Sequence, residues 1–228
     1  MTGKDNATPH SSGEYDEKVR KTIPFYDAFH DETIELVKAV GNPALWLDTG
    51  CGTGTLVEKA AAIFPTSRFL VADPSEAMLK AATARLSSLQ DRVTFLGRFD
   101  TAGLAGRLDD APDVITAIQS HHYLRPSGRR DVTRVCFDML APGGLYVTFE
   151  NVRPLTERGI EICLKRARDY QLASGLSEGF AADHAKRFDT QYFPVTVEEH
   201  LALLRETGFS VVELFWFSRM QAGFYAIK

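Results

Sequence analysis

Short apolar runs alternate with longer segments of mixed polarity through the middle of the chain. The runs are four to seven residues long and rich in Val, Ile, Leu and Phe, which is typical of buried strands. The intervening segments carry apolar residues at helical spacing. We predict strands at 44–48, 67–73, 92–97, 113–118 and 144–150, and helices at 54–64, 75–88 and 127–140. Such an alternation indicates a parallel sheet with helices on both faces.

The C-terminal part follows a different order. A helix is predicted at 197–207, and two strand-like runs follow at 209–217 and 223–227 with only a short turn between them. Adjacent strands joined by a tight turn form a hairpin, so one of them must run antiparallel to the rest. We therefore predict a doubly wound α/β fold with seven strands, mostly parallel with an antiparallel last strand.

Two segments lie outside this alternation. Residues 14–43 predict a helical cap, with one helix from Tyr15, a break at Pro24 and a second helix at 34–40. Residues 151–195 are an insertion with predicted helices at 157–174 and 178–188, and we expect a lid over the strand ends or, alternatively, a packing or dimer element. Residues 1–13 are polar and are predicted to be a disordered tail, which leaves 14–228 as one domain.

A glycine-rich turn follows the first predicted strand. Asp48 ends that strand, and Gly50, Gly52 and Gly54 occupy alternate positions before the next helix. Glycine permits a sharp turn and the close approach of a ligand, and a strand–turn–helix of this kind is the nucleotide site of many doubly wound sheets. The second strand ends at Asp73, whose carboxylate is suited to two ribose hydroxyls; helix capping is the alternative role.

The pattern Asp-x-Gly-x-Gly-x-Gly with an acid after the next strand resembles class I S-adenosylmethionine-dependent methyltransferases. It differs from the Gly-x-Gly-x-x-Gly fingerprint of dinucleotide enzymes, and the acid before the glycines would repel a pyrophosphate. The resemblance implies S-adenosyl-L-methionine as cofactor and assigns its contacts by position. The methionine part would meet Asp48, Gly50, Cys51, Gly52, Gly54 and Gln119, the ribose Asp73, and the adenine Pro74, Met78, Phe99 and Asp100.

Two histidines follow the fourth strand. Adjacent residues at a strand end point in opposite directions, so one of His121 and His122 is expected to reach the acceptor. A histidine that titrates near neutrality is suited to act as a general base. Methyl transfer from a sulfonium requires a base only if the acceptor loses a proton, so the alternative is a site that positions the acceptor and supplies no base.

Within this superfamily the chain is similar to the bacterial tRNA wobble-uridine carboxymethyltransferases. The similarity lies in Tyr15-Asp-Glu-Lys-Val19, Ile23-Pro-Phe-Tyr26, the insertion, and Lys186-Arg187 followed by Thr196 and Glu199-His200. It implies that Tyr26 contacts the cofactor and that Arg187 pairs with the carboxylate of carboxy-S-adenosylmethionine. The glycine turn, however, has the ordinary methyltransferase form, and residues 151–190 are nearly neutral, with seven Lys or Arg against six Asp or Glu.

Composition narrows the function further. The net charge of −4 gives no pull toward nucleic acid or anionic membrane, and no apolar run is long enough to span a bilayer. Three cysteines without metal-type spacing fit a reduced, cytoplasmic protein and predict no metal site. We expect a methyltransferase for a small-molecule acceptor. The alternatives are a tRNA carboxymethyltransferase that uses carboxy-S-adenosylmethionine and a non-catalytic cofactor-binding protein.

Overall fold

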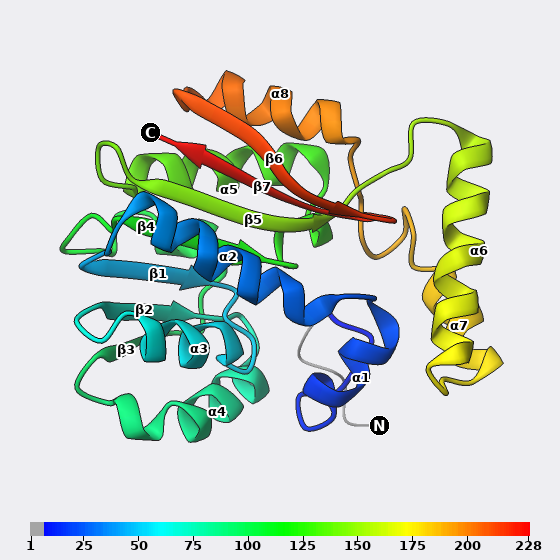
Figure 1. The fold of residues 1–228 in the computed structure, drawn as a ribbon, viewed down its shortest axis with the longest axis horizontal. Coiled ribbons are helices and arrows are strands. Elements are labelled where there is room, and N and C mark those ends of the chain that lie inside the picture. The colour runs from blue at the N-terminus through cyan, green and yellow to red at the C-terminus, as the bar shows by residue number, and fades with distance from the viewer. Residues whose placement is uncertain (1–6) are drawn as a thin grey trace.

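The computed structural model describes residues 7–228; residues 1–6, part of the predicted tail, lie outside it. One seven-stranded sheet crosses the molecule in the order β3-β2-β1-β4-β5-β7-β6 (Figure 1). The first five strands are parallel, and β7 is antiparallel to both of its neighbours. This arrangement confirms the predicted fold class. The strands are β1 Leu45–Thr49, β2 Arg68–Ala72, β3 Val93–Gly97, β4 Val114–Ile118, β5 Leu145–Asn151, β6 Val211–Ser218 and β7 Gln221–Ile227.

Helices cover both faces of the sheet. One face carries α2 (Tyr26–Val40), α3 (Thr55–Ile63) and α4 (Glu76–Arg85), and the other carries α5 (Pro126–Met139) and α8 (Val197–Thr207). Successive residues of a strand point to opposite faces. Trp46 accordingly packs in the core under α3, while Leu47 packs in the core under α5.

Helix α1 of the cap and the insertion stand together beyond one end of the sheet. Helix α1 (Tyr15–Thr22) contacts α6 (Glu157–Ala173), which in turn packs on α7 (Glu178–Ala185) (Figure 1). The insertion leaves and rejoins the domain at one point, because Val152 and Val195 form an isolated β-bridge. The two inserted helices begin at the predicted positions, and α7 ends three residues early.

Three local features differ from the sequence prediction. Helix α2 begins at Tyr26 instead of residue 34, because Phe25 adopts a left-handed φ of 60° and lets the helix restart directly after Pro24. His121–Tyr123 form a short 3₁₀ helix, η3, after β4 instead of a strand end. Residues 7–10 lie against the fold: His10 is buried, and its Nε2 is 2.7 Å from the Thr22 hydroxyl.

Candidate functional site

The turn between β1 and α3 is built by three glycines with positive φ, Gly50, Gly52 and Gly54. A Cβ on Gly50 would lie 2.8 Å from the Ser120 Cβ, so glycine is required there by packing against the end of β4. A Cβ on Gly52 would meet nothing within 4 Å, because this residue borders open space. Gly54 is the N-cap of α3 and packs on Leu86 away from that space, so its role is structural.

Asp73 fixes the shape of this turn. Its Oδ2 accepts a hydrogen bond from Gly52 N at 2.9 Å, and its Oδ1 accepts one from Ser75 N at 2.9 Å. Ser75 then caps α4 by accepting from Met78 N. The carboxylate thus orients the turn and the start of α4. Each carboxylate oxygen accepts more than one hydrogen bond, so these bonds leave capacity for ribose hydroxyls.

Asp48 lies fully buried beneath the turn. The Thr116 hydroxyl donates to its Oδ1 at 2.7 Å. Burial raises the pKa of Asp48 to about 7, and the neighbouring charge of Asp73 adds to the rise. Cys51, three positions after Asp48, is also buried, and burial raises the pKa of its thiol well above the ordinary value. Its thiol is therefore neutral and unsuited to act as a nucleophile.

A cavity of about 280 Å³, here called the turn cavity, opens beside the glycine turn. It brings together most of the predicted cofactor contacts and one of the histidines. Its lining includes Gly50, Gly52, Asp73, Pro74, Met78, Asp100, Gln119 and His121. Asp100 also caps the short helix after β3 by accepting from Gly103 N at 2.8 Å.

Five of the predicted contacts lie elsewhere. Asp48, Cys51 and Tyr26 line a smaller cavity of about 30 Å³, which shares Gly50 and Gly52 with the turn cavity. Phe99 lines neither cavity; its ring packs beneath the Arg107 guanidinium at 4.5 Å. Gly54, as described above, serves the packing of α3.

Gln119 is a strained, buried residue at the end of β4. Its φ is 54°, and its side chain is 7% exposed. Neither its amide nitrogen nor its amide oxygen has a hydrogen-bond partner within residues 7–228. Because buried amides without partners are costly, this residue is a strong candidate for ligand contact.

Both histidines are buried and hydrogen-bonded, and the general-base role of one of them stays a prediction, since His121 also lines the turn cavity. The His121 Nε2 is 2.8 Å from the Thr101 hydroxyl, and its Nδ1 is 3.1 Å from the Tyr146 hydroxyl. Burial lowers the pKa of His121 to about 4. The prediction assumed alternating directions along a strand, whereas both residues lie in η3 and both side chains are buried.

His122 is similarly occupied. Its Nδ1 is 3.2 Å from Glu150 Oε2, and its Nε2 is 3.1 Å from Asn151 Nδ2. Burial lowers the pKa of His122 despite the nearby Glu150 carboxylate. The contact with His122 offsets the burial of Glu150 and holds the pKa of that carboxyl at about 2. The pair anchors η3 and thereby positions Tyr123.

A second cavity of about 60 Å³, here called the lid cavity, lies among α1, α6, α7 and residues 8–10. It adjoins the turn cavity, because both are lined by Thr8, Tyr15, Gln119 and Tyr123. The sequence analysis did not select Tyr15 or Tyr123 as site residues. The signal for Tyr15 was its place in the quoted N-terminal motif, and the signal for Tyr123 was its position after the two histidines.

Arg187 lines the lid cavity and is 7% exposed. Its Nε donates to Gln191 Oε1 at 2.8 Å, and its Nη2 donates to the Ala7 carbonyl oxygen. No carboxylate pairs with Arg187 within the described part of the chain. The lining of this cavity contains three arginines and no Asp or Glu among residues 7–228.

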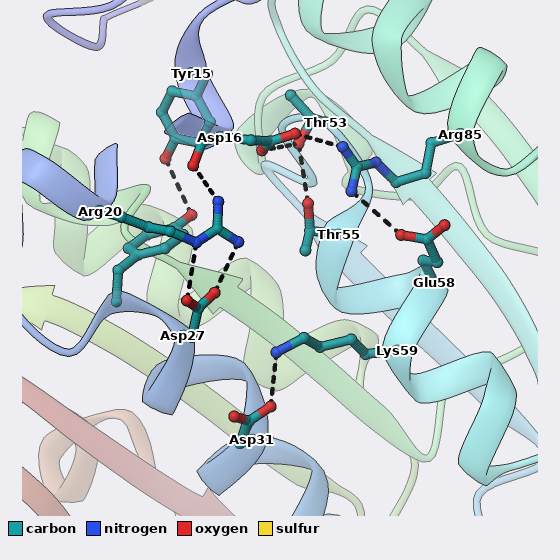
Figure 2. Close-up of polar contacts among 11 residues, drawn as sticks. Tyr15, Asp16, Arg20, Asp27, Asp31, Thr53, Thr55, Glu58, Lys59 and Arg85 are labelled. Carbon is teal, nitrogen blue, oxygen red and sulfur yellow. Dashed lines mark hydrogen bonds and ion pairs between the residues drawn. The ribbon is translucent and has the colours of Figure 1, made fainter. Parts of the chain in front are cut away.

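The cap is fastened to the glycine turn by polar contacts (Figure 2). Asp16 on α1 accepts from the Thr53 hydroxyl at 2.8 Å and forms an ion pair with Arg85, which also pairs with Glu58 at 3.2 Å. Tyr15, the next residue on α1, is held by a hydroxyl–hydroxyl contact of 3.2 Å with Tyr26. These contacts place Tyr15 at the junction of the two cavities.

Comparison with known proteins agrees with this geometry. A family model described as "Methyltransferase domain" matches residues 47–146, which include the glycine turn. A carboxy-S-adenosyl-L-methionine synthase from Nautilia profundicola is 23% identical over 94% of this chain and 90% of its own length. One from Pseudoalteromonas atlantica is 23% identical over 94% of this chain and 88% of its own length.

Solved structures show the same fold. An O-methyltransferase family protein from Burkholderia thailandensis has a TM-score of 0.61 at 15% identity, over 98% of this chain and 65% of that one. Human N-acetylserotonin methyltransferase, solved with S-adenosylmethionine, has a TM-score of 0.58 at 16% identity, over 95% of this chain and 58% of that one. This chain therefore spans about three-fifths of the length of these two neighbours.

The residues present fit the cofactor. The glycine turn offers close approach at Gly52, Asp73 keeps acceptor capacity, and Gln119 supplies a buried amide that has no partner within residues 7–228. Residues 47–146 match a methyltransferase domain, and these features agree with the resemblance of the chain to the class I S-adenosylmethionine-dependent methyltransferases; the chain is a methyltransferase enzyme, and its cofactor is S-adenosylmethionine.

Proposed function

We propose that this enzyme transfers the methyl group of S-adenosylmethionine to an anionic small molecule held in the lid cavity. The observation that carries the proposal is Arg187. A buried guanidinium without a carboxylate partner is unfavourable, because desolvation is not offset by an opposite charge. Such a residue is favourable once an anionic ligand supplies that charge, and a guanidinium matches a carboxylate or phosphate with paired hydrogen bonds.

The surroundings of Arg187 support the same conclusion. Arg168 and Arg219 line the same cavity, and Arg168 is paired with Glu178, which leaves Arg187 as the better anion anchor. Tyr123 lines both cavities, and the charge of Arg187 counteracts the rise that burial causes in the pKa of the Tyr123 hydroxyl. An anion held at Arg187 would therefore lie on the acceptor side of the cofactor.

The residues of the chain position the reactants. When bound, S-adenosylmethionine would supply a methyl group activated by its sulfonium, with a neutral thioether as the leaving group and any acceptor proton released to solvent when the product leaves. The protein aligns the two partners and excludes water from them. Gln119 and Tyr123 lie at the cavity junction where this alignment is set. His121 and His122 hold η3.

A second candidate function follows from the curated relatives, which are named carboxy-S-adenosyl-L-methionine synthases. In this alternative the anion that meets Arg187 is the carboxylate of the carboxylated cofactor itself. The tRNA carboxymethyltransferase hypothesis likewise requires Arg187 to bind the carboxylate of the carboxylated cofactor. The nearly neutral insertion gives little support to tRNA binding, which favours a basic surface.

Competition binding separates the two candidates. We expect S-adenosylmethionine and carboxy-S-adenosylmethionine to bind the wild-type protein with affinities within about threefold of each other. If Arg187 instead binds the cofactor carboxylate, the carboxylated cofactor gains about 1.5–3 kcal/mol, or roughly ten- to a hundredfold. A preference of that size, lost in Arg187→Met but kept in the matched control Arg168→Met, would replace the first proposal with the second.

The acceptor class is tested separately. A library of carboxylic and phosphorylated small molecules is screened by thermal shift in the presence of S-adenosylhomocysteine. We expect stabilisation by acidic compounds that is lost in Arg187→Met and retained in Arg168→Met. Hits that are neutral or cationic, and that stabilise Arg187→Met as well as the wild type, would contradict an anionic acceptor.

A further inference from the structure

Residues 7–10, here called the strap, form a wall that both cavities share. Ala7 and Thr8 line the turn cavity, while Thr8, Pro9 and His10 line the lid cavity. The Ala7 carbonyl oxygen accepts a hydrogen bond from Arg187. One short segment therefore covers the cofactor, the space beside it and the proposed anion anchor.

The His10 side chain holds the strap against the fold. The His10 ring is 3% exposed and stacks on Phe180 of α7, with centroids 5.2 Å apart and planes within 8°. Its Nε2 is 2.7 Å from the Thr22 hydroxyl at the end of α1. That hydroxyl donates to the Lys18 carbonyl, so it accepts its hydrogen bond from His10. His10 thus clips the cap helix to the lid helix.

The lid cavity is too small in this state for an organic acceptor. Its volume is about 60 Å³, whereas an engineered apolar cavity that binds benzene measures about 150 Å³. At least one wall must therefore move. Helix α1 is tied to the glycine turn through Asp16, but the strap has no helical or strand hydrogen bonding of its own.

We propose that the strap is a gate, clipped by His10, that lifts to let ligands exchange. Lifting would enlarge the lid cavity and free the Arg187 Nη2, at which the Ala7 carbonyl holds the place of a ligand oxygen. The gate goes beyond methyl transfer and rests on the cofactor site assigned above. Because a gate opens for entry and exit alike, unclipping it changes both rates and leaves the equilibrium nearly unchanged.

Stopped-flow mixing with S-adenosylhomocysteine tests the gate. In His10→Ala and in the more conservative Thr22→Val, we expect association and dissociation rates each to rise about fivefold or more, with Kd changed less than about threefold. The control Ser11→Ala removes an exposed contact with Glu14 next to the strap and should leave both rates unchanged. Hydrogen exchange of amides 7–14 should also quicken in both unclipped variants.

The opposite outcomes are distinct. Unchanged association and dissociation rates in both His10→Ala and Thr22→Val would overturn the gate. Faster dissociation with unchanged association would also overturn it, because that result indicates a lost contact with the ligand. The melting temperature shows whether His10→Ala is still folded. If this variant is unfolded, the exchange rates of Thr22→Val test the gate. Failure of the wild-type protein to bind S-adenosylhomocysteine in calorimetry would count against the cofactor assignment and not against the gate.

Discussion

At the scale of single residues, Asp48 couples cofactor binding to pH. Its pKa of about 7 in the free protein means that the carboxyl is largely protonated at pH 6. The positive charge of S-adenosylmethionine would favour the ionised form, since an opposite charge nearby lowers the pKa of an acid. Binding at pH 6 should therefore release a proton.

We expect the affinity for S-adenosylmethionine to rise between pH 5.5 and 7, approaching tenfold per pH unit at its steepest. Calorimetry in two buffers with different ionisation enthalpies measures the released proton directly. In Asp48→Asn the affinity should be weaker and nearly independent of pH in this range. A wild-type affinity that is flat from pH 5.5 to 7 would show that the cofactor does not sense Asp48.

The residue scale also explains which of the predicted cofactor contacts lie together in the structure. Gly50, Gly52 and Asp73 belong to one continuous turn and the adjacent strand end, so local sequence was sufficient to place them. The surroundings of His121 and His122 were not predicted, because Thr101, Tyr146 and Glu150 reach these rings from distant segments. Their residue types alone did not distinguish a base from an anchor.

At the scale of elements, α8 packs on the sheet through His200, a buried residue that lowers the stability of the fold. His200 is buried against Phe224 of β7, with ring centroids 4.3 Å apart, and neither ring nitrogen has a hydrogen-bond partner within residues 7–228. Burial lowers the pKa of His200 to about 4. We expect His200→Leu to raise the free energy of unfolding by about 1–3 kcal/mol at pH 7, because an unsatisfied buried polar group is removed.

Urea denaturation of both proteins measures this change. The benefit should be larger at pH 5, where the wild-type histidine is protonated on unfolding and the leucine is not. A variant that is less stable than the wild type at pH 7 would indicate that the ring has polar partners, such as bound water, and the prediction would fail.

Elements differ in how far the sequence predicts them. The strands and the helices between them were placed closely, because burial on one or both faces imposes a regular spacing. The early start of α2 depends on one left-handed residue, Phe25, which no apolar pattern encodes. The lid cavity was not predicted because Tyr15, Gln119, Tyr123 and Arg187 come from four separate segments that only tertiary packing unites.

At the scale of the whole molecule, buried neutral histidines govern stability toward acid. Burial lowers the pKa of His30, His121, His200 and the half-buried His184 to about 4, and burial also lowers the pKa of His122. A base whose folded pKa is depressed stabilises the fold above its unfolded pKa of about 6.5, and this contribution is lost as the pH falls through the folded value. Asp48 acts in the opposite direction, since its folded pKa is raised.

We therefore expect the free energy of unfolding to fall steeply between pH 6.5 and pH 4. Each fully buried histidine with a pKa near 4 contributes on the order of 3 kcal/mol to this loss, against a gain of similar size from the single Asp48. Urea titrations at pH 7, 6, 5 and 4 provide the measurement. Equal stability at pH 7 and pH 5 would mean that these rings are not buried in the neutral form.

The order of the strands has a consequence for synthesis. Strand β7 is the last of the seven to leave the ribosome, yet it lies inside the sheet between β5 and β6. Until β7 emerges, the backbone N–H and C=O groups along one edge of β5 are unpaired, and β6 has no neighbouring strand to pair with. An unpaired edge of this kind invites contact with other nascent chains. The enzyme therefore depends on its final strand for solubility during translation, long before the cofactor can bind.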